Sequence, residues 1–262
     1  MTVYFFALTL STALLSLFSS GLLQRYIGES AARYRVSWAP DGRAYSIWWL
    51  IYSTTFAAAL VGLALHANVE RSALLLWSGT WLLAPISVFV ADNQRRCQVV
   101  LAALVLLGAF GTSLAALFLQ QAWPSHSGEQ ILLFAPLSLL SGWLLVASSV
   151  GVGTALTCAE PSFGEIAAKD EISLRIWEDA TRDAIFARRK HTTTTQNVTM
   201  VILALVGGCL ALAIPDPIFV WPIVWAVILQ RGFPRSIWLW CAILILIAGC
   251  VVSVVRVFVW EF

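Results

Sequence analysis

Aromatic side chains are the residues of this chain best suited to bind another molecule. The segment SWAPDGRAYSIWWLIYS at 37–53 holds three Trp and two Tyr around one Pro-Asp-Gly turn, directly before a long apolar run. Aromatic rings with a polar edge favour the boundary between water and lipid, and they also line pockets for flat apolar ligands. The segment therefore predicts either an interfacial aromatic belt or a ligand pocket.

Groups that could perform acid-base, nucleophilic or metal chemistry are scattered along the chain. The histidines His66, His126 and His191 fall in different predicted loops, and the five cysteines form no CxxC pair. No HExxH, GxSxG, P-loop or GxGxxG pattern occurs. Because no predicted span has an Asp, Glu, Lys, Arg or His in its core, the usual groups of ion-coupled transport are missing as well. We expect no catalytic residue and no metal site, and hence a protein that is not an enzyme.

The composition is that of an integral membrane protein. Hydrophobic residues make up 60% of the chain and charged residues 11%, with a mean hydropathy of +0.83; an ordinary soluble domain is about 25% charged. Since lipid cannot satisfy backbone polar groups, the spans must be helices or a closed barrel, and long apolar runs without alternation indicate helices. A net charge of +2 without a dense basic block excludes nucleic acid as a partner.

The elements that must position the aromatic residues are apolar runs long enough to cross a bilayer, which takes about 20 residues. We predict an all-α, polytopic transmembrane bundle of about eight spans, at 3–23, 44–65, 73–91, 99–119, 131–157, 198–214, 218–230 and 236–255. The seventh run is short, so whether it crosses the membrane fully stays open.

The loop charges predict the orientation of this bundle. All Lys and Arg residues except Arg71 and Arg256 fall in the first, third, fifth and seventh loops of the eight-span topology. Basic residues in short loops accumulate on the cytoplasmic side or its organellar equivalent. We therefore expect these loops on the cytoplasmic, matrix or stromal side and both termini on the opposite side.

One sizeable polar segment divides the chain into three regions. Residues 1–157 form a predicted five-helix bundle, 158–196 a polar amphipathic helix and linker, and 197–262 the C-terminal membrane helices. In the middle region a capping-box pattern precedes apolar residues at helical spacing. This helix is either a solvated connector on the membrane surface or a docking element for a partner, with Ile172, Ile176 and Trp177 as docking residues.

Three stretches resemble a known family. YSIWWLIY at 45–52, APLSLLSGWLLVASSVG at 135–151 and DPIFVWPIVWAVI at 216–228 are similar to motifs of the tryptophan-rich sensory protein family, also called the translocator protein or peripheral benzodiazepine receptor family. The likeness is to its longer members. Ala84 and Ser87 lie near the place where the third helix of the family usually carries Asn, and Gly151 stands where its fifth helix carries another.

The resemblance implies a five-helix bundle whose first loop covers a cavity for a porphyrin, a sterol, a lipid or a similar flat lipophile. It implies ligand-binding roles for Trp38 on the loop, for Trp143 on the fifth helix, and for four residues of the second helix, namely Tyr45, Trp48, Trp49 and Tyr52. Trp48 and Tyr52 are four residues apart, hence on one helix face with Tyr45, whereas Trp49 projects about 100° away. Each ring also has a plainer interpretation as ordinary packing or as part of an interfacial belt.

Two functions remain open from the sequence. The first is a membrane protein that binds or senses a hydrophobic small molecule, surrounded by membrane lipids and paired as a homodimer, as members of the resembled family commonly are. The second is an accessory subunit of a large mitochondrial or plastid membrane complex that has lost ligand binding. The missing Asn residues and the charged segment at 158–196 favour the second interpretation.

Overall fold

The described part of the chain is built from helices. The computed structural model describes residues 3, 6–17, 42–65, 69–91, 96–121, 128–159, 202, 205–210, 213–214, 216–228, 248, 251 and 255. Within these residues no strand occurs, and the regular elements include the Phe6–Leu17 helix, the short 3-10 helix η1 (Gly42–Ser46), α2 (Ile47–Ala64), α3 (Arg71–Ala91), α4 (Arg96–Gln121), α5 (Gly128–Ala159) and α8 (Pro217–Ile228). The predicted all-α class is confirmed.

Four of these helical stretches are long and apolar enough to cross a membrane. They are Arg43–Ala64, Arg71–Val90, Cys97–Gln120 and Leu133–Leu156. Their bounds agree within a few residues with the runs predicted at 44–65, 73–91, 99–119 and 131–157, so the chain is a multi-span integral membrane protein. The total of eight spans and the sidedness of the loops stay predictions.

Helix α8 coincides with the short seventh run of the prediction. Its 12 residues rise about 18 Å at 1.5 Å per residue, whereas the hydrocarbon core of a bilayer is about 30 Å thick. The described residues of α8 therefore cover part of that thickness, and whether the seventh run crosses the membrane fully stays open. Helix α8 packs against α5.

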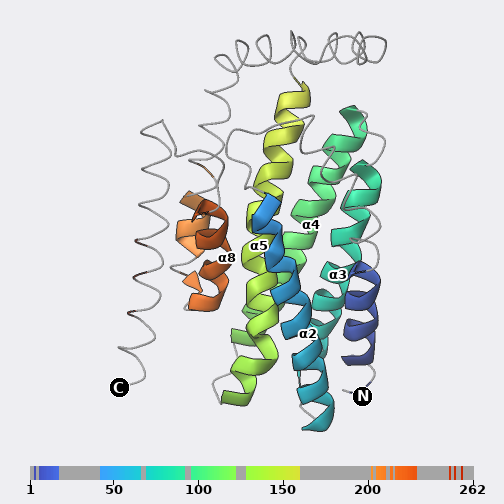
Figure 1. Ribbon diagram of the computed structural model, residues 1–262, viewed down its shortest axis with the longest axis vertical. Helices are drawn as coiled ribbons and strands as arrows, with labels where there is room; N and C mark the ends of the chain where they lie inside the picture. The colour runs from blue at the N-terminus through green and yellow to red at the C-terminus, as the bar shows by residue number, and fades with distance from the viewer. Residues whose placement is uncertain are drawn as a thin grey trace.

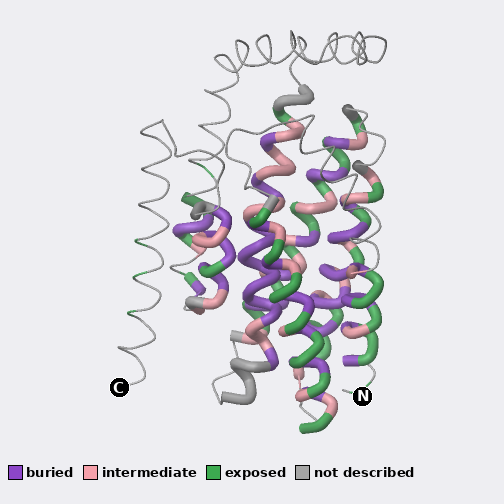
Figure 2. Tube along the Cα trace, in the orientation of Figure 1, coloured by how far each residue is buried: buried purple, intermediate pink, exposed green. Residues whose placement is uncertain are grey.

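Helix α5 lies at the centre of the bundle. It contacts α2, α4 and α8, while α3 packs on α4 (Figure 1). Of the apolar stretch of α5, 72% is buried, against 33–44% for the other three long stretches. Figure 2 shows this difference as a concentration of buried positions on α5 and on the faces turned toward it. Helix α5 is thus the most deeply buried of the four membrane-capable stretches.

Hydroxyl side chains are satisfied within the bundle, as lipid requires. Many donate to a carbonyl three or four residues back; Thr55 Oγ1, for example, donates to the Ile51 carbonyl at 2.7 Å. Others join neighbouring helices. These bonds link Thr9 to Ser78 at 3.1 Å, Thr80 to Thr112 at 3.0 Å, and Ser148 Oγ to the Leu106 carbonyl at 3.1 Å. Such bonds contribute about 0.6 kcal/mol each in membrane proteins, so side-chain packing supplies most of the cohesion.

Candidate functional site

The aromatic residues at the start of α2 lie on one face of the helix. The rings of Trp48 and Tyr52 are stacked, with centroids 5.5 Å apart and planes inclined by 23°. This is the arrangement expected for side chains one helical turn apart. The shared face predicted from their spacing is therefore present in the structure.

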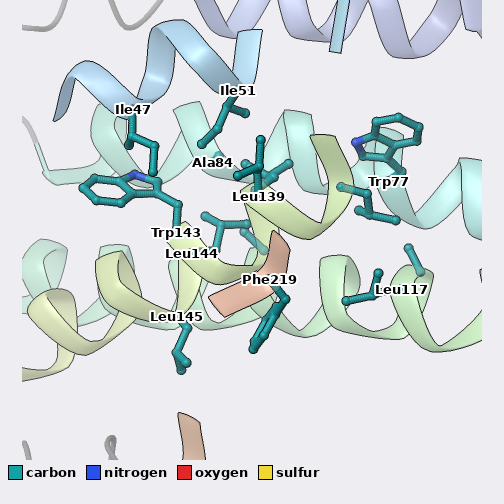
Figure 3. Packing of buried hydrophobic residues seen from close by; sticks show 14 of the residues in the cluster. Ile47, Ile51, Trp77, Ala84, Leu117, Leu139, Trp143, Leu144, Leu145 and Phe219 are labelled. Atoms are coloured by element: carbon teal, nitrogen blue, oxygen red, sulfur yellow. The ribbon is translucent and has the colours of Figure 1, made fainter. Parts of the chain in front are cut away.

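Trp143 on α5 joins this face from the neighbouring helix. Its ring meets Tyr45 edge-on at a centroid distance of 5.6 Å and Trp48 edge-on at 6.3 Å, with interplanar angles of 81° and 80°. Figure 3 shows the Trp143 indole next to Ile47, between α5 and α2. Only 1% of Trp143 is exposed. Two segments almost a hundred residues apart thus contribute rings to one site.

A third helix contributes a ring that the sequence analysis did not single out. Trp81 on α3 stacks on Tyr52 with a centroid distance of 5.6 Å and an interplanar angle of 29°. The backbones of α2 and α3 hardly approach each other, so the two helices meet through these large rings. The available signal was the spacing of Trp77 and Trp81, which repeats the four-residue spacing of Trp48 and Tyr52.

We call the contiguous set of rings formed by Tyr45, Trp48, Tyr52, Trp81 and Trp143 the aromatic cluster. Tyr45 and Trp48 are half-buried at its edge, and the other three rings are buried. The cluster offers stacking faces and ring edges, and it contains no nucleophile paired with a base. The interactions available to it are ring stacking and edge-on ring contacts.

The remaining predicted site residues lie elsewhere. Trp49 points away from the aromatic cluster and is 72% exposed, as its rotation of about 100° from Trp48 requires. Four predicted residues lie outside the described residues: Trp38, Ile172, Ile176 and Trp177. The structure thus brings together four of the six predicted ligand residues.

Helix α8 is anchored beside the cluster at its first residues. Asp216 precedes Pro217 and acts as the N-cap, because its Oδ1 accepts the Ile218 backbone N–H at 2.8 Å. Proline is favoured at the first helical position, where no backbone donor is needed. The other carboxylate oxygen of Asp216 accepts a hydrogen bond from the Ser138 hydroxyl on α5. One side chain therefore both starts α8 and ties it to α5.

A glycine and a tryptophan complete the docking of α8. A Cβ added to Gly142 would lie 2.0 Å from the Phe219 carbonyl oxygen, so only glycine permits this approach of α8 to α5. Further along α8, Trp225 Nε1 donates to the Ala44 carbonyl of η1 at 3.2 Å. Trp221 stacks on Trp225 at 5.3 Å. Helix α8 is thereby bound to both the turn and the helix that carry cluster residues.

The positions where the family pattern carries Asn do not all face the cluster. A Cβ on Gly151 would make ordinary contact with Ala103 of α4, at 3.6 Å from its Cα. Gly151 therefore packs at the interface of α4 and α5. Ser87 is buried and donates to the Ala84 carbonyl at 2.6 Å within α3.

Charged groups stay at the ends of the described helices. Glu70 precedes α3 and accepts hydrogen bonds from the Ser72 hydroxyl and the Ala73 backbone N–H. The bond from Ser72 is the main reason why the pKa of Glu70 lies below its ordinary value of 4.5. In the described ranges no group of three His, Cys, Asp or Glu side chains could hold a metal ion. Among the charged groups Asp216 is the exception, because its carboxylate meets Ser138 within the apolar stretch of α5. The aromatic cluster itself contains no charged residue.

Comparison with models of protein families gave a match. A family model described as TSPO-like protein matches residues 1–169. That range contains every ring of the aromatic cluster and ends well before α8. No curated protein and no solved structure matches the chain.

Proposed function

The chain belongs to the TSPO-like protein family, and from that premise we propose that it binds or senses a flat hydrophobic molecule at the aromatic cluster, without catalysing a reaction. The candidate ligands are a porphyrin, a sterol or a lipid with a rigid ring system. The observation that carries the proposal is the convergence of Tyr45, Trp48 and Tyr52 with Trp143 and Trp81 from two other helices.

The energetics of the cluster favour an exchangeable occupant. An aromatic pair contributes about 0.5–1.5 kcal/mol beyond the area it buries. A flat ligand that inserts beside Trp48 separates one pair of protein rings and stacks on Trp48 in its place. Because the lost and the gained ring contacts are equivalent, separating the protein rings adds little to the free energy of binding. Tyr45 and Trp48 are only half-buried, and they form the side of the cluster from which a ligand enters.

Helix α8 supports the site from outside the segment that defines the family. Trp225 holds the Ala44 carbonyl, next to Tyr45, and Gly142 seats α8 one residue from Trp143. In the proposed function, α8 braces the two segments that carry these rings and so keeps the ligand-facing geometry in place. This gives the C-terminal region a role within the same chain.

Two adjacent tryptophans provide a matched test of the proposal. The purified protein in mild detergent is titrated with the dimethyl ester of protoporphyrin IX, an uncharged porphyrin, and quenching of tryptophan fluorescence is followed. Trp48→Ala should weaken binding at least ten-fold, because truncating a central aromatic contact costs on the order of 2 kcal/mol. Trp49→Ala removes the same side chain from an exposed position and should change the dissociation constant less than two-fold.

The outcome that opposes the proposal is equally clear. Equal losses of affinity in both variants would mean that porphyrin adheres to exposed aromatic surface and not to the cluster. Ligand binding at this site would be refuted if porphyrin gave no saturable quenching, if cholesterol did not compete with it, and if no other flat lipophile tested bound saturably.

A further inference from the structure

Buried polar atoms without a protein partner are all of one kind in the described part of the chain. They are the indole nitrogens of Trp77 and Trp81 and the amide nitrogen of Gln120. Each of these groups is a hydrogen-bond donor. Buried hydroxyls and acceptors, by contrast, find partners within the bundle. The interior therefore has an excess of N–H donors and lacks acceptors for them.

Two of these donors share one helix face. Trp77 and Trp81 are four residues apart on α3, so their side chains leave the helix on the same side, one turn apart. They are 2% and 1% exposed. Trp77 belongs to the same buried core cluster as Leu117 and Leu139 (Figure 3). Trp81 also belongs to the aromatic cluster through its stacking on Tyr52.

Packing alone does not explain two indoles at these positions. A buried donor without an acceptor destabilises a folded protein, and a phenylalanine would supply most of the same apolar surface without that penalty. Buried Trp N–H groups usually have a hydrogen-bond partner. Trp77 and Trp81 are two such unpaired donors, and they lie on the same face of α3, where Trp81 is part of the aromatic cluster. We expect the missing hydrogen-bond acceptor to be supplied by a bound ligand.

We infer that Trp77 and Trp81 present their N–H groups to a carbonyl oxygen of the bound molecule, which is therefore a flat, uncharged lipophile bearing a ketone, ester or amide. The inference rests on the proposed function, because it names the chemical class that the aromatic cluster binds. It assigns Trp77 and Trp81 to specificity for that class, while the stacked rings supply affinity.

The charge distribution decides between a carbonyl and a carboxylate. In the elements packed around this face, the described charged residues Arg43, Arg71, Arg96 and Glu129 lie at or near helix ends. The carboxylate of Asp216, at the start of α8, is already held by Ser138 and the Ile218 backbone N–H, and it offers no positive charge. Trp81 lies ten residues beyond Arg71, about 15 Å along the helix, which is near mid-bilayer depth. A carboxylate there would be an uncompensated charge in an apolar medium. A neutral carbonyl accepts the same hydrogen bonds without that cost.

A pair of probes that differ by one oxygen tests this assignment. The two are 2-acetylanthracene and 2-ethylanthracene, which share a flat tricyclic ring but differ in the acceptor. The wild-type protein should bind the ketone about 10-fold more tightly, the effect of one buried hydrogen bond. Trp77→Phe and Trp81→Phe should reduce this preference toward unity while changing the affinity for 2-ethylanthracene less than three-fold. Trp49→Phe, at an exposed position, should leave the preference intact.

The infrared carbonyl stretch gives a measurement that needs no variant. The stretch of 2-acetylanthracene bound to the wild-type protein should lie below its position in an alkane solvent, because hydrogen bonding weakens the C=O bond. An unshifted stretch would overturn the inference even if the phenylalanine variants fail to fold.

The possible failures are distinguishable. Equal affinity for the two probes, or a preference that survives both substitutions, would refute the role of Trp77 and Trp81 and leave ligand binding at the aromatic cluster standing. Ordered water alone as the partner of the indoles would give that same result. If neither probe binds saturably, the proposed function fails and the inference fails with it.

Discussion

Replacing Gly142 by alanine tests the seating of α8 on α5. The added Cβ would lie 2.0 Å from the Phe219 carbonyl oxygen and 3.2 Å from Pro222 Cγ. A carbon and a carbonyl oxygen approach no closer than about 3.3 Å even in favourable contacts, so α8 must move away by about 1.3 Å. The obstructing atom belongs to the backbone, and a rotamer change cannot remove it.

The expected size of the effect follows from two opposing terms. Overpacking a well-packed interface costs about 1–3 kcal/mol, while replacing glycine by alanine in a helix favours the helix by about 0.8–1 kcal/mol. Because the whole of α8 must shift, we place the packing cost at the upper end of its range. Gly142→Ala should therefore lower the free energy of unfolding by about 1–2 kcal/mol.

Gly151 provides the matched control on the same helix. Its added Cβ would meet Ala103 Cα at 3.6 Å, an ordinary contact distance. With no obstruction, only the helix-propensity term remains, and Gly151→Ala should be neutral or raise the free energy of unfolding by up to about 1 kcal/mol. The same substitution is thus expected to have opposite signs at two sites nine residues apart.

Gly62 is expected to fall between these two cases. Its added Cβ would lie 2.3 Å from the ring of Phe6, which is a side chain that can rotate. Since this ring is buried, moving it still disturbs the contact between the Phe6–Leu17 helix and α2. The predicted order of stability is Gly151→Ala, then Gly62→Ala, then Gly142→Ala.

Unfolding by SDS in mixed micelles, followed by near-ultraviolet circular dichroism of the buried tryptophans, measures these differences. The three variants are compared with the parent protein at one detergent concentration. Gly142→Ala equal to or more stable than Gly151→Ala would refute the close approach of α8 to α5, and with it the brace assigned to the C-terminal region.

Three further outcomes follow from the described contacts. Asp216→Ala removes the cap of α8 and should lower the free energy of unfolding by about 1–2 kcal/mol in the same SDS titration. Trp225→Phe loses the bond to the Ala44 carbonyl and should cost about 1 kcal/mol there; an unchanged transition would argue against that bond. Because the pKa of Glu70 is lowered in the folded protein, the ionised carboxylate contributes its full stabilisation of the fold above the ordinary pKa of 4.5, and this contribution is lost as the pH falls through the folded pKa. Ser72→Ala should raise the pKa of Glu70, as measured by a carboxyl NMR titration. An unchanged pKa would contradict the hydrogen bond from Ser72 as the cause.

Part of the candidate site could be predicted from local spacing. The four-residue interval between Trp48 and Tyr52 placed both rings on one face, and the structure stacks them. The same rule placed Trp49 on another face, where it is exposed. Applied to α3, it would also have singled out Trp77 and Trp81. Such inferences succeed because the direction of a side chain from a helix depends on its position in the turn.

The role of α8 could not be predicted in this way. The run at 218–230 was recognised as apolar, but nothing local indicates that Gly142 receives the Phe219 carbonyl or that Trp225 bonds to Ala44. These contacts join residues far apart in the chain, and they depend on shape complementarity between whole helices. The resemblance to the family likewise did not indicate that Gly151 packs against α4.

The amino-acid sequence by itself determined that this protein is a helical membrane protein, because lipid leaves an apolar chain no other way to satisfy its backbone than local helical hydrogen bonds. It also determined which rings share a helix face. Only the tertiary structure decided which faces meet, which indoles are buried without acceptors, and where α8 is seated. The physical reason is that lipid is as apolar as the helices themselves, so their arrangement depends on close van der Waals fit and a few hydrogen bonds between distant segments.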